Sequence, residues 1–361
     1  MKLEINGENL YFQSTQIIEF ENSVILKRGI NQLQIAGEMA FETIKVISTL
    51  ASGDGCTEDY LLDYLGGYND ESIITIINEL KTKGFLITDV DAFKYNIDND
   101  EYQQKIFYEN LNVGREYIDA LKQKKVAVIG INSVSRQIVK SLTESQIMNY
   151  QLVDNKLFRN VNFFSDNGQL RLDVWNNELQ NITSYDDWVD SLENSGLDIL
   201  ICTSDFGGMQ LMRDFNKFCV DNNIMFLPVV LQDFKGFVGP LVVPGETACF
   251  ECLLNRQNSI MPNFTVKRTT ECSAFEGQRV VGFHPTMSSI LGDIAVMELI
   301  KFFTKTLQSW NAGALIEVNL LKTEMKSRKV LKIPRCSVCS EMNTISKVTV
   351  YNSTFNPTNY E

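Results

Sequence analysis

The sequence predicts an α/β protein in which a small winged-helix unit precedes a doubly wound sheet. Three observations lead to this prediction. Short β-rich segments and three amphipathic helices fill residues 15–90, strands of a buried type alternate with helices from residue 126 onward, and two matched Cys-x-x-Cys pairs follow. A chain of 361 residues is also more typical of two domains than of one.

The first predicted unit begins with strands and continues with helices. Side chains that favour β-structure occupy 17–20, 24–27 and 31–37, with a turn at Arg28-Gly29. Helices are expected over 38–51, after the capping residue Thr57, and from Asn69 or Asp70 to Gly84, and a strand is expected at 85–88. This order is typical of a winged helix, which we assign to residues 15–90.

Three segments are assigned outside the predicted domains. Residues 8–14 read Glu-Asn-Leu-Tyr-Phe-Gln-Ser, which resembles an engineered protease site, so residues 1–14 are treated as a tag remnant outside the fold. Residues 91–107 are acidic and polar, and we interpret them as a linker. Residues 343–361 are interpreted as a C-terminal tail.

The second predicted unit, residues 108–342, alternates strands and helices. A helix over 108–123 leads to a buried-type strand at 126–130, and further strands are expected at 150–154, 198–202 and 225–230. Residues 255–283 are polar and are expected to be irregular, residues 285–303 form an apolar helix, and two or three strands lie between 312 and 333. Such alternation predicts a doubly wound sheet of the Rossmann type.

Four cysteines in two pairs predict a metal site. Cys249 and Cys252 form one Cys-x-x-Cys unit, and Cys336 and Cys339 form another. Each unit can direct two thiolates at one tetrahedral ion, and a shell of sulfur alone favours Zn²⁺. Because protein would fill all four positions, we expect a structural zinc ion rather than a catalytic one. The alternative is two unrelated pairs that are free or redox-active.

A nucleotide-binding sheet of this kind needs glycines after its first strand, because bare backbone must approach the phosphates. Here the turn reads Gly130-Ile-Asn-Ser-Val-Ser135, and only Gly130 is present. The Cβ atoms of Asn132 and Val134 are expected to crowd a phosphate. Asp154, at the end of the second strand, is suited to a ribose hydroxyl or to capping its own loop, and we favour the cap. The sequence therefore predicts a degenerate nucleotide site, at Gly130, Asn132 and Asp154, that does not bind ATP.

Composition excludes several classes of function. A net charge of −12 argues against nucleic acid as a partner, and no run of eighteen apolar residues is present to span a membrane. The single histidine, His284, precedes Pro285 and is assigned a structural role at a helix N-terminus. We expect a cytoplasmic protein, since no secretory signal is recognised and the cysteine spacing is that of a zinc site. The remaining cysteines, Cys56, Cys202, Cys219 and Cys272, are expected to be buried thiols.

The stretch Gly239-Pro-Leu-Val-Val-Pro-Gly-Glu-Thr-Ala-Cys-Phe-Glu-Cys252, with Arg335-Cys-Ser-Val-Cys339, resembles ThiF-like proteins, the family of ubiquitin-activating enzymes. The resemblance covers roughly residues 108–342. It implies that Cys249, Cys252, Cys336 and Cys339 are zinc ligands. It also implies a homodimer.

A divergent branch of that family lacks the nucleotide site and carries an N-terminal winged-helix element. The resemblance to that branch implies that the chain binds the leader of a ribosomally made precursor peptide. It would present the core of that peptide to a separate YcaO-type cyclodehydratase, the partner that uses ATP to make azolines. The leader is expected to pair with the strand at 31–37. The expected groove residues are Leu33, Gln34, Ile35, Ile73, Ile77, Leu80 and Lys81, although the apolar ones are equally explained as core.

Two other functions remain open. An active adenylyltransferase, acting on a peptide or carrier C-terminus, would need the turn at 130–135 to admit ATP. A winged-helix regulator with a ligand-sensing ThiF-like domain would need a basic surface, which the acidic net charge disfavours.

Overall fold

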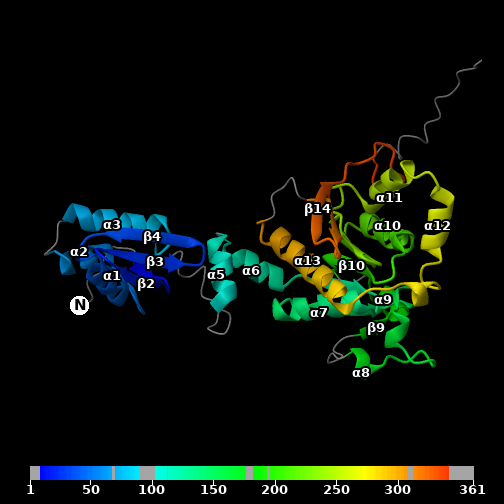
Figure 1. Ribbon diagram of the computed structural model, residues 1–361, viewed down its shortest axis with the longest axis horizontal. Coiled ribbons are helices and arrows are strands. Elements are labelled where there is room, and N and C mark those ends of the chain that lie inside the picture. The colour runs from blue at the N-terminus through cyan, green and yellow to red at the C-terminus, as the bar shows by residue number, and fades with distance from the viewer. Residues whose placement is uncertain are drawn as a thin grey trace, which may run out of the picture. The chain divides into compact units, whose positions relative to one another are not determined.

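The computed structural model describes residues 9–66, 70–88, 102–111, 113–175, 182–192, 196–306 and 312–340 (Figure 1). The chain divides into two compact units, residues 1–119 and 120–361. The boundary therefore falls later than the predicted division at 107. The predicted C-terminal tail, 343–361, and residues 91–101 of the predicted linker lie outside the described residues.

The first unit contains two small antiparallel sheets and several helices. One sheet has the order β2-β3-β4 and the other the order β5-β1-β6. Its strands are β1 (Asn9–Phe12), β2 (Gln16–Phe20), β3 (Ser23–Arg28), β4 (Asn31–Ala36), β5 (Cys56–Thr57) and β6 (Leu86–Thr88). Its helices are α1 (Ala40–Leu50), α2 (Glu58–Tyr64), α3 (Asp70–Thr82) and α5 (Tyr102–Asn110), and the boundary with the second unit falls within α6 (Arg115–Lys122).

The core of the first unit forms where the apolar faces of these elements meet. Val24 and Leu26 of β3 and Ile44 and Ile47 of α1 are all fully buried. Thr57 caps α2 as predicted, since its side chain accepts a hydrogen bond from the backbone N–H of Tyr60. The predicted strands and helices of residues 15–88 are thus present, with shifts of a few residues at their ends.

Two features of this unit correct the sequence predictions. Residues 9–12 form β1, which pairs with β5 and β6, and Leu10 is only 2% exposed, so excluding all of residues 1–14 from the fold was wrong. The predicted helix at 108–123 is instead two helices, α5 and α6. Glu109 of α5 pairs with the buried Arg28 of β3, so α5 belongs to the first unit rather than to the second.

The second unit is built on an eight-stranded sheet of order β14-β13-β12-β11-β10-β7-β8-β9. Strands β11, β10, β7, β8 and β9 run parallel, and β12, β13 and β14 continue the sheet antiparallel. The strands are β7 (Val126–Ile129), β8 (Tyr150–Asp154), β9 (Ile182–Ser184), β10 (Ile199–Ser204), β11 (Met225–Gln232), β12 (Lys235–Val238), β13 (Ala314–Asn319) and β14 (Glu324–Lys329). The predicted doubly wound sheet is confirmed, and its strand order reverses at β7.

Helices pack against this sheet. Its α-helices are α7 (Ser133–Glu144), α8 (Leu172–Trp175), α9 (Tyr185–Ser191), α10 (Arg213–Asp221), α11 (Phe250–Ser259), α12 (Phe264–Cys272) and α13 (Pro285–Phe303). Short 3₁₀ turns lie at η2 (Lys156–Phe158), η3 (Val161–Phe163), η5 (Met209–Met212) and η6 (Gln278–Val280). Residues 255–283 were expected to be irregular, but they are largely helical in α11 and α12. No helix in the described ranges is long and apolar enough to cross a membrane.

Candidate functional site

The turn between β7 and α7 lies at the point where the strand order reverses, the place where open α/β sheets bind ligands. Gly130 holds a left-handed φ of 106° there. Asn132 is the N-cap of α7, and its side-chain oxygen accepts from the N–H groups of Val134 at 3.1 Å and Ser135 at 3.0 Å. Ser135 Oγ accepts in return from the N–H of Asn132 at 3.0 Å, which completes a capping box.

The one remaining N–H of this first turn is bound by a carboxylate. Ser133 N–H donates to Asp205 Oδ2 at 2.8 Å, and Asn160 Nδ2 donates to the same oxygen at 2.7 Å. Asp205 is fully buried, and burial raises the pKa of its carboxyl, although these hydrogen bonds partly oppose the shift. A helix N-terminus is a common binding site for phosphate, and here the carboxyl group of Asp205 takes that position.

The side-chain amide of Asn132 also links the turn to two neighbouring segments. Its Nδ2 donates to the carbonyl oxygen of Phe158 at 3.1 Å and to Thr203 Oγ1 at 2.9 Å. A Cβ on Gly130 would lie 2.8 Å from Asn132 Nδ2 and 2.9 Å from Phe158 Cβ. Gly130 is therefore required by this packed turn itself, because both φ and space exclude a side chain.

Asp154, the candidate ribose ligand at the end of β8, is held by a neighbouring arginine. Arg159 Nε donates to Asp154 Oδ1 at 2.7 Å, and its Nη2 donates to Oδ2 at 2.6 Å. The guanidinium also lies over the ring of Phe164, 4.4 Å from the ring centre. This bidentate pair engages both carboxylate oxygens and links the end of β8 to the loop that follows it.

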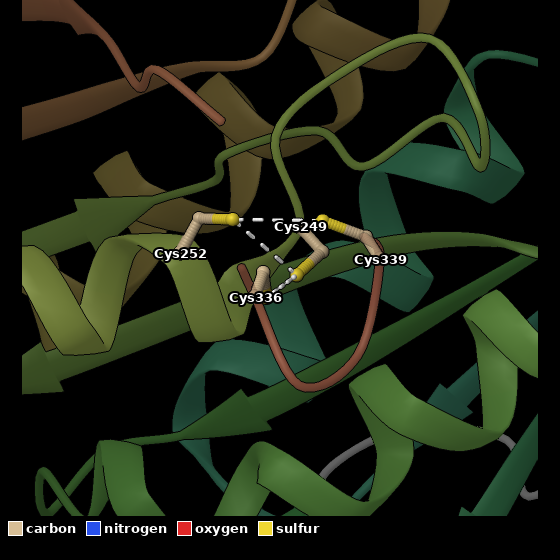
Figure 2. Close-up of side chains that lie close together, drawn as sticks. All are labelled: Cys249, Cys252, Cys336 and Cys339. Atoms are coloured by element: carbon tan, nitrogen blue, oxygen red, sulfur yellow. Dashed lines mark hydrogen bonds between the residues drawn. The ribbon is translucent and has the colours of Figure 1, made fainter. Parts of the chain in front are cut away.

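The four predicted zinc ligands converge, and Figure 2 shows their sulfur atoms directed toward one another. Their Sγ atoms all lie within 4.8 Å of each other. Sγ–Sγ separations are 3.8 Å for Cys249–Cys252, 3.5 Å for Cys249–Cys336 and 3.5 Å for Cys252–Cys339. Zn–S bonds of about 2.3 Å in a tetrahedron place sulfurs about 3.8 Å apart, so the donor set fits a structural zinc ion.

Secondary structure positions these ligands. Cys249 is the N-cap residue of α11, and the first turn of that helix carries Cys252. The second pair follows β14, where the N–H of Ile333 donates to Cys252 Sγ at 3.4 Å. Cys249, Cys252 and Cys336 are buried, so a bound ion would be shielded from solvent.

The other cysteines were predicted to be buried. Cys56, Cys202 and Cys219 are buried, and burial raises the pKa of each thiol. Cys272 is exposed, so for this residue the prediction was wrong. His284 is the N-cap of α13, and its ring nitrogen accepts from the N–H of Thr286, in line with the structural role assigned to it.

The residues expected to line a leader groove divide into two sets. Ile73, Ile77 and Leu80 of α3 are at most 2% exposed and belong to the core, as the alternative interpretation anticipated. Lys81 is paired with Glu58. Leu33 and Ile35 are half-buried, and Gln34 is exposed. Gln34 thus lies at the surface, Leu33 and Ile35 pack partly against the core, and the helix residues lie inside it.

The outer edge of β4 carries no strand among the described residues. Gly37 N–H donates to the carbonyl oxygen of Asn22 at 2.7 Å, which identifies that pair as hydrogen-bonded. Hydrogen-bonded and non-hydrogen-bonded residue pairs alternate along an antiparallel ladder. The backbone groups of Ile35, Leu33 and Asn31 therefore form hydrogen bonds with β3. The N–H and C=O groups of Gln32, Gln34 and Ala36 consequently point away from β3, toward the open edge.

Sequence reasoning missed Asp205 and Asn160, which complete the closed turn. Asp205 follows β10 directly, and β10 lies beside β7 in the sheet. Because parallel strands end at the same edge, the Thr203-Ser-Asp205 sequence after a buried strand was a signal that an acid would lie near the turn at 130–135.

Comparisons with known proteins give the class of fold. The ThiF family model matches residues 165–338, and the chain therefore contains a ThiF-like domain. The matched stretch begins beyond the closed turn and Asp154. No curated protein matches the sequence.

Solved structures match over nearly the whole chain. The structure of the microcin C7 biosynthetic enzyme MccB in complex with N-formylated MccA has a TM-score of 0.65 and 19% identity, covering 92% of this chain and 100% of that one. Escherichia coli MccB with ATP gives 0.63 and 19%, with the same coverage. The heterocyclase TruD gives 0.59 and 16%, covering 94% of this chain and 44% of that one. At these identities the likeness shows the fold alone.

Proposed function

We propose that this chain is a non-catalytic subunit of a peptide-modifying complex that binds the leader of a ribosomally made precursor. It would present the core of that peptide to a separate YcaO-type cyclodehydratase, which supplies ATP chemistry and forms azolines. The observation that carries the proposal is the closed turn after β7. There Asn132, Ser135 and Asp205 bind the N–H groups that a phosphate would need.

The position of the Asp205 side chain supports the proposed loss of ATP binding. A phosphate arriving at the N-terminus of α7 would meet the buried carboxyl of Asp205 at 2.8 Å from Ser133 N. To bind there it would have to displace that side chain and break the capping box. Arg159, the nearest arginine along the chain after β8, is already committed to Asp154. The degenerate nucleotide site predicted at Gly130, Asn132 and Asp154 is therefore part of the proposal.

Peptide binding is assigned to the open edge of β4. Three residues there direct backbone groups outward, so an extended leader can add a strand through main-chain hydrogen bonds. Gln34 and the half-buried Leu33 and Ile35 would contact it, whereas the core residues Ile73, Ile77 and Leu80 would only support the strand. Tethering the leader raises the effective concentration of the core peptide at the partner enzyme.

The fold neighbours support a role of this kind. MccB is described as a biosynthetic enzyme and was solved in complex with MccA, and TruD is described as a heterocyclase. This chain covers 44% of TruD. We assign the cyclisation chemistry to a separate polypeptide as part of the proposal. A homodimer, a cytoplasmic location and a structural zinc ion complete the proposal.

Calorimetry separates this function from the alternative, an active adenylyltransferase. We expect no binding of Mg²⁺-ATP at 1 mM, about the weakest affinity calorimetry would register, and leader binding with a Kd below about 100 μM. Leader peptides encoded beside the gene are the ligands to titrate. ATP binding in the micromolar range, with pyrophosphate released on adding a peptide, would instead establish the adenylyltransferase. Failure of every leader peptide to bind would remove the leader-binding role.

A further inference from the structure

The two pairs of candidate zinc ligands lie on segments that are far apart in the sequence. Cys249 and Cys252 lie at the start of α11, whereas Cys336 and Cys339 follow β14. One ion can bind all four sulfur atoms only if the chain after β14 is held beside α11. Contacts between these two segments other than those of the cysteines therefore bear on how well zinc binds.

Arg256, one helical turn beyond Cys252, binds the segment that leads to the second pair. Its Nε donates to the carbonyl oxygen of Leu331 at 2.9 Å, and its Nη2 donates to that of Lys332 at 3.2 Å. The next residue, Ile333, donates its N–H to Cys252 Sγ at 3.4 Å. Residues four apart lie on the same face of a helix, so Cys252 and Arg256 hold three consecutive residues from one side.

A further contact joins the same two segments in the opposite direction. Lys332 Nζ donates to the carbonyl oxygen of Gly245, in the loop before α11. Ile333 packs partly against the core, but Leu331 is 60% exposed and Lys332 is exposed as well. Burial therefore contributes little to holding residues 331 and 332, and hydrogen bonds, two of them from Arg256, hold these residues against α11.

We propose that Arg256 is a positioning residue for the zinc site. It is not a ligand, but it keeps residues 331 and 332 beside α11, so that Cys336 and Cys339 reach the pair on the helix. The fork of the guanidinium suits this role because it directs two donors, Nε and Nη2, at two carbonyl oxygens. The inference rests on the structural zinc ion of the proposed function.

The expected effect of Arg256 follows from the cost of ordering the chain. Without its two hydrogen bonds the segment after β14 would be held less firmly, and binding of the ion would have to order it. That loss of conformational entropy lowers the affinity for zinc. Groups that orient metal ligands commonly change metal affinity by about 10- to 100-fold when they are removed.

The test is the affinity of the full chain for Zn²⁺, measured under reducing conditions by competition with a chromogenic chelator. We expect Arg256→Ala to bind Zn²⁺ about tenfold more weakly than wild type, or worse. Arg256→Lys keeps the positive charge but loses the fork, and it should also bind more weakly than wild type. Both variants should fold, because Arg256 is exposed.

Arg335→Ala is the matched control. Arg335 directly precedes Cys336 and is exposed, and its side chain forms no hydrogen bond or ion pair within the described ranges. The variant removes the same charge next to a ligand without removing a contact between the two segments. Its affinity for Zn²⁺ should therefore equal that of wild type.

Urea unfolding of the metal-free proteins gives a second readout. Metal-free Arg256→Ala should unfold at nearly the same urea concentration as metal-free wild type, because the lost contacts lie at the surface and loosen one segment only. A lower midpoint with unchanged affinity for Zn²⁺ would mean that Arg256 only stabilises the fold.

The outcomes separate this inference from the zinc site itself. Wild type that binds no Zn²⁺ would overturn both. Wild type and Arg256→Ala that bind Zn²⁺ equally would overturn the role of Arg256 alone. That role would also be overturned if Arg335→Ala weakens binding as much as Arg256→Ala, or if Arg256→Lys binds like wild type, because positive charge would then be the cause.

Discussion

The carboxylate of Asp205 accepts the backbone N–H of Ser133 at 2.8 Å, joining the loop after β10 to the first turn of α7. The contact places a carboxyl group of the chain itself where a nucleotide fold of this type receives a phosphate. It also links two segments 72 residues apart in sequence through a fully buried bond. The turn is therefore a structural junction, and its members should affect stability rather than catalysis.

Replacing Asn132 with alanine should destabilise the second unit by about 2–4 kcal/mol. The change removes an N-cap, worth about 1 kcal/mol, and the buried bonds to Phe158 and Thr203, each worth about 1 kcal/mol. Ser184→Ala is the matched control, because Ser184 caps α9 at an exposed position, where its hydroxyl bonds to the N–H and carboxylate of Asp187. It should cost about 1 kcal/mol or less. Urea unfolding measures the loss of stability in both variants. Equal losses would contradict the structural role assigned to the turn after β7.

The buried carboxyl of Asp205 should make stability depend on pH in a defined direction. Burial raises its pKa in the folded chain, so the folded state holds the proton more tightly than the unfolded state. The free energy of unfolding then falls as pH rises from about 4, the unfolded value, to the raised pKa, by up to about 1.4 kcal/mol per pH unit.

Asp205→Asn isolates this effect, since an amide keeps an acceptor oxygen but does not titrate. Urea unfolding at a series of pH values from about 4 upward should show wild type losing stability relative to the variant as pH rises toward the raised pKa of Asp205. Glu109, whose pKa burial also raises, is present in both proteins and cancels in the difference. Parallel curves over the whole range would mean that Asp205 does not titrate in this window.

The cysteine cluster should bind one zinc ion per chain, and losing one ligand should destabilise the second unit by about 3–5 kcal/mol. Cys336→Ser removes a buried ligand, whereas Cys272→Ser changes an exposed thiol outside the cluster and serves as the control. Elemental analysis counts the metal, and thermal unfolding measures the loss. A Cys336→Ser protein with unchanged zinc content and melting temperature would exclude a structural metal here.

The sequence predicted an element correctly where the residues that indicate it lie within that element. The bounds of α13 were predicted correctly because His284-Pro285 and a long apolar pattern are contained within that segment. The spacing within the two Cys-x-x-Cys pairs likewise predicted that their sulfur atoms converge on one site. By contrast, β1 was missed because residues 8–14 resemble a protease site and were excluded from the fold. Its pairing with β5 and β6 depends on segments that lie far along the chain.

The helices α11 and α12 are a second case in which local sequence did not predict the structure. Residues 255–283, which include the end of α11 and all of α12, are largely polar, and a polar segment without a clear apolar stripe does not indicate a helix. Among the buried groups of α11 is Glu251, which pairs with Arg213 of α10, a partner that only the tertiary structure supplies. The roles of Asp205 and Asn160 were hidden for this reason too, since both act across elements.

The open edge of β4 leads to the prediction on peptide recognition. Gln34→Pro removes one outward backbone N–H while leaving the ladder to β3 intact, because Gln34 does not donate its N–H to that strand. Gln34→Ala is the matched control: it loses the same side chain, including its bond to Ser23, but keeps the N–H. Leader binding should weaken about tenfold in the proline variant and remain near wild type in the alanine variant. Fluorescence anisotropy with a labelled leader measures both, and equal affinities would place the leader elsewhere on the chain.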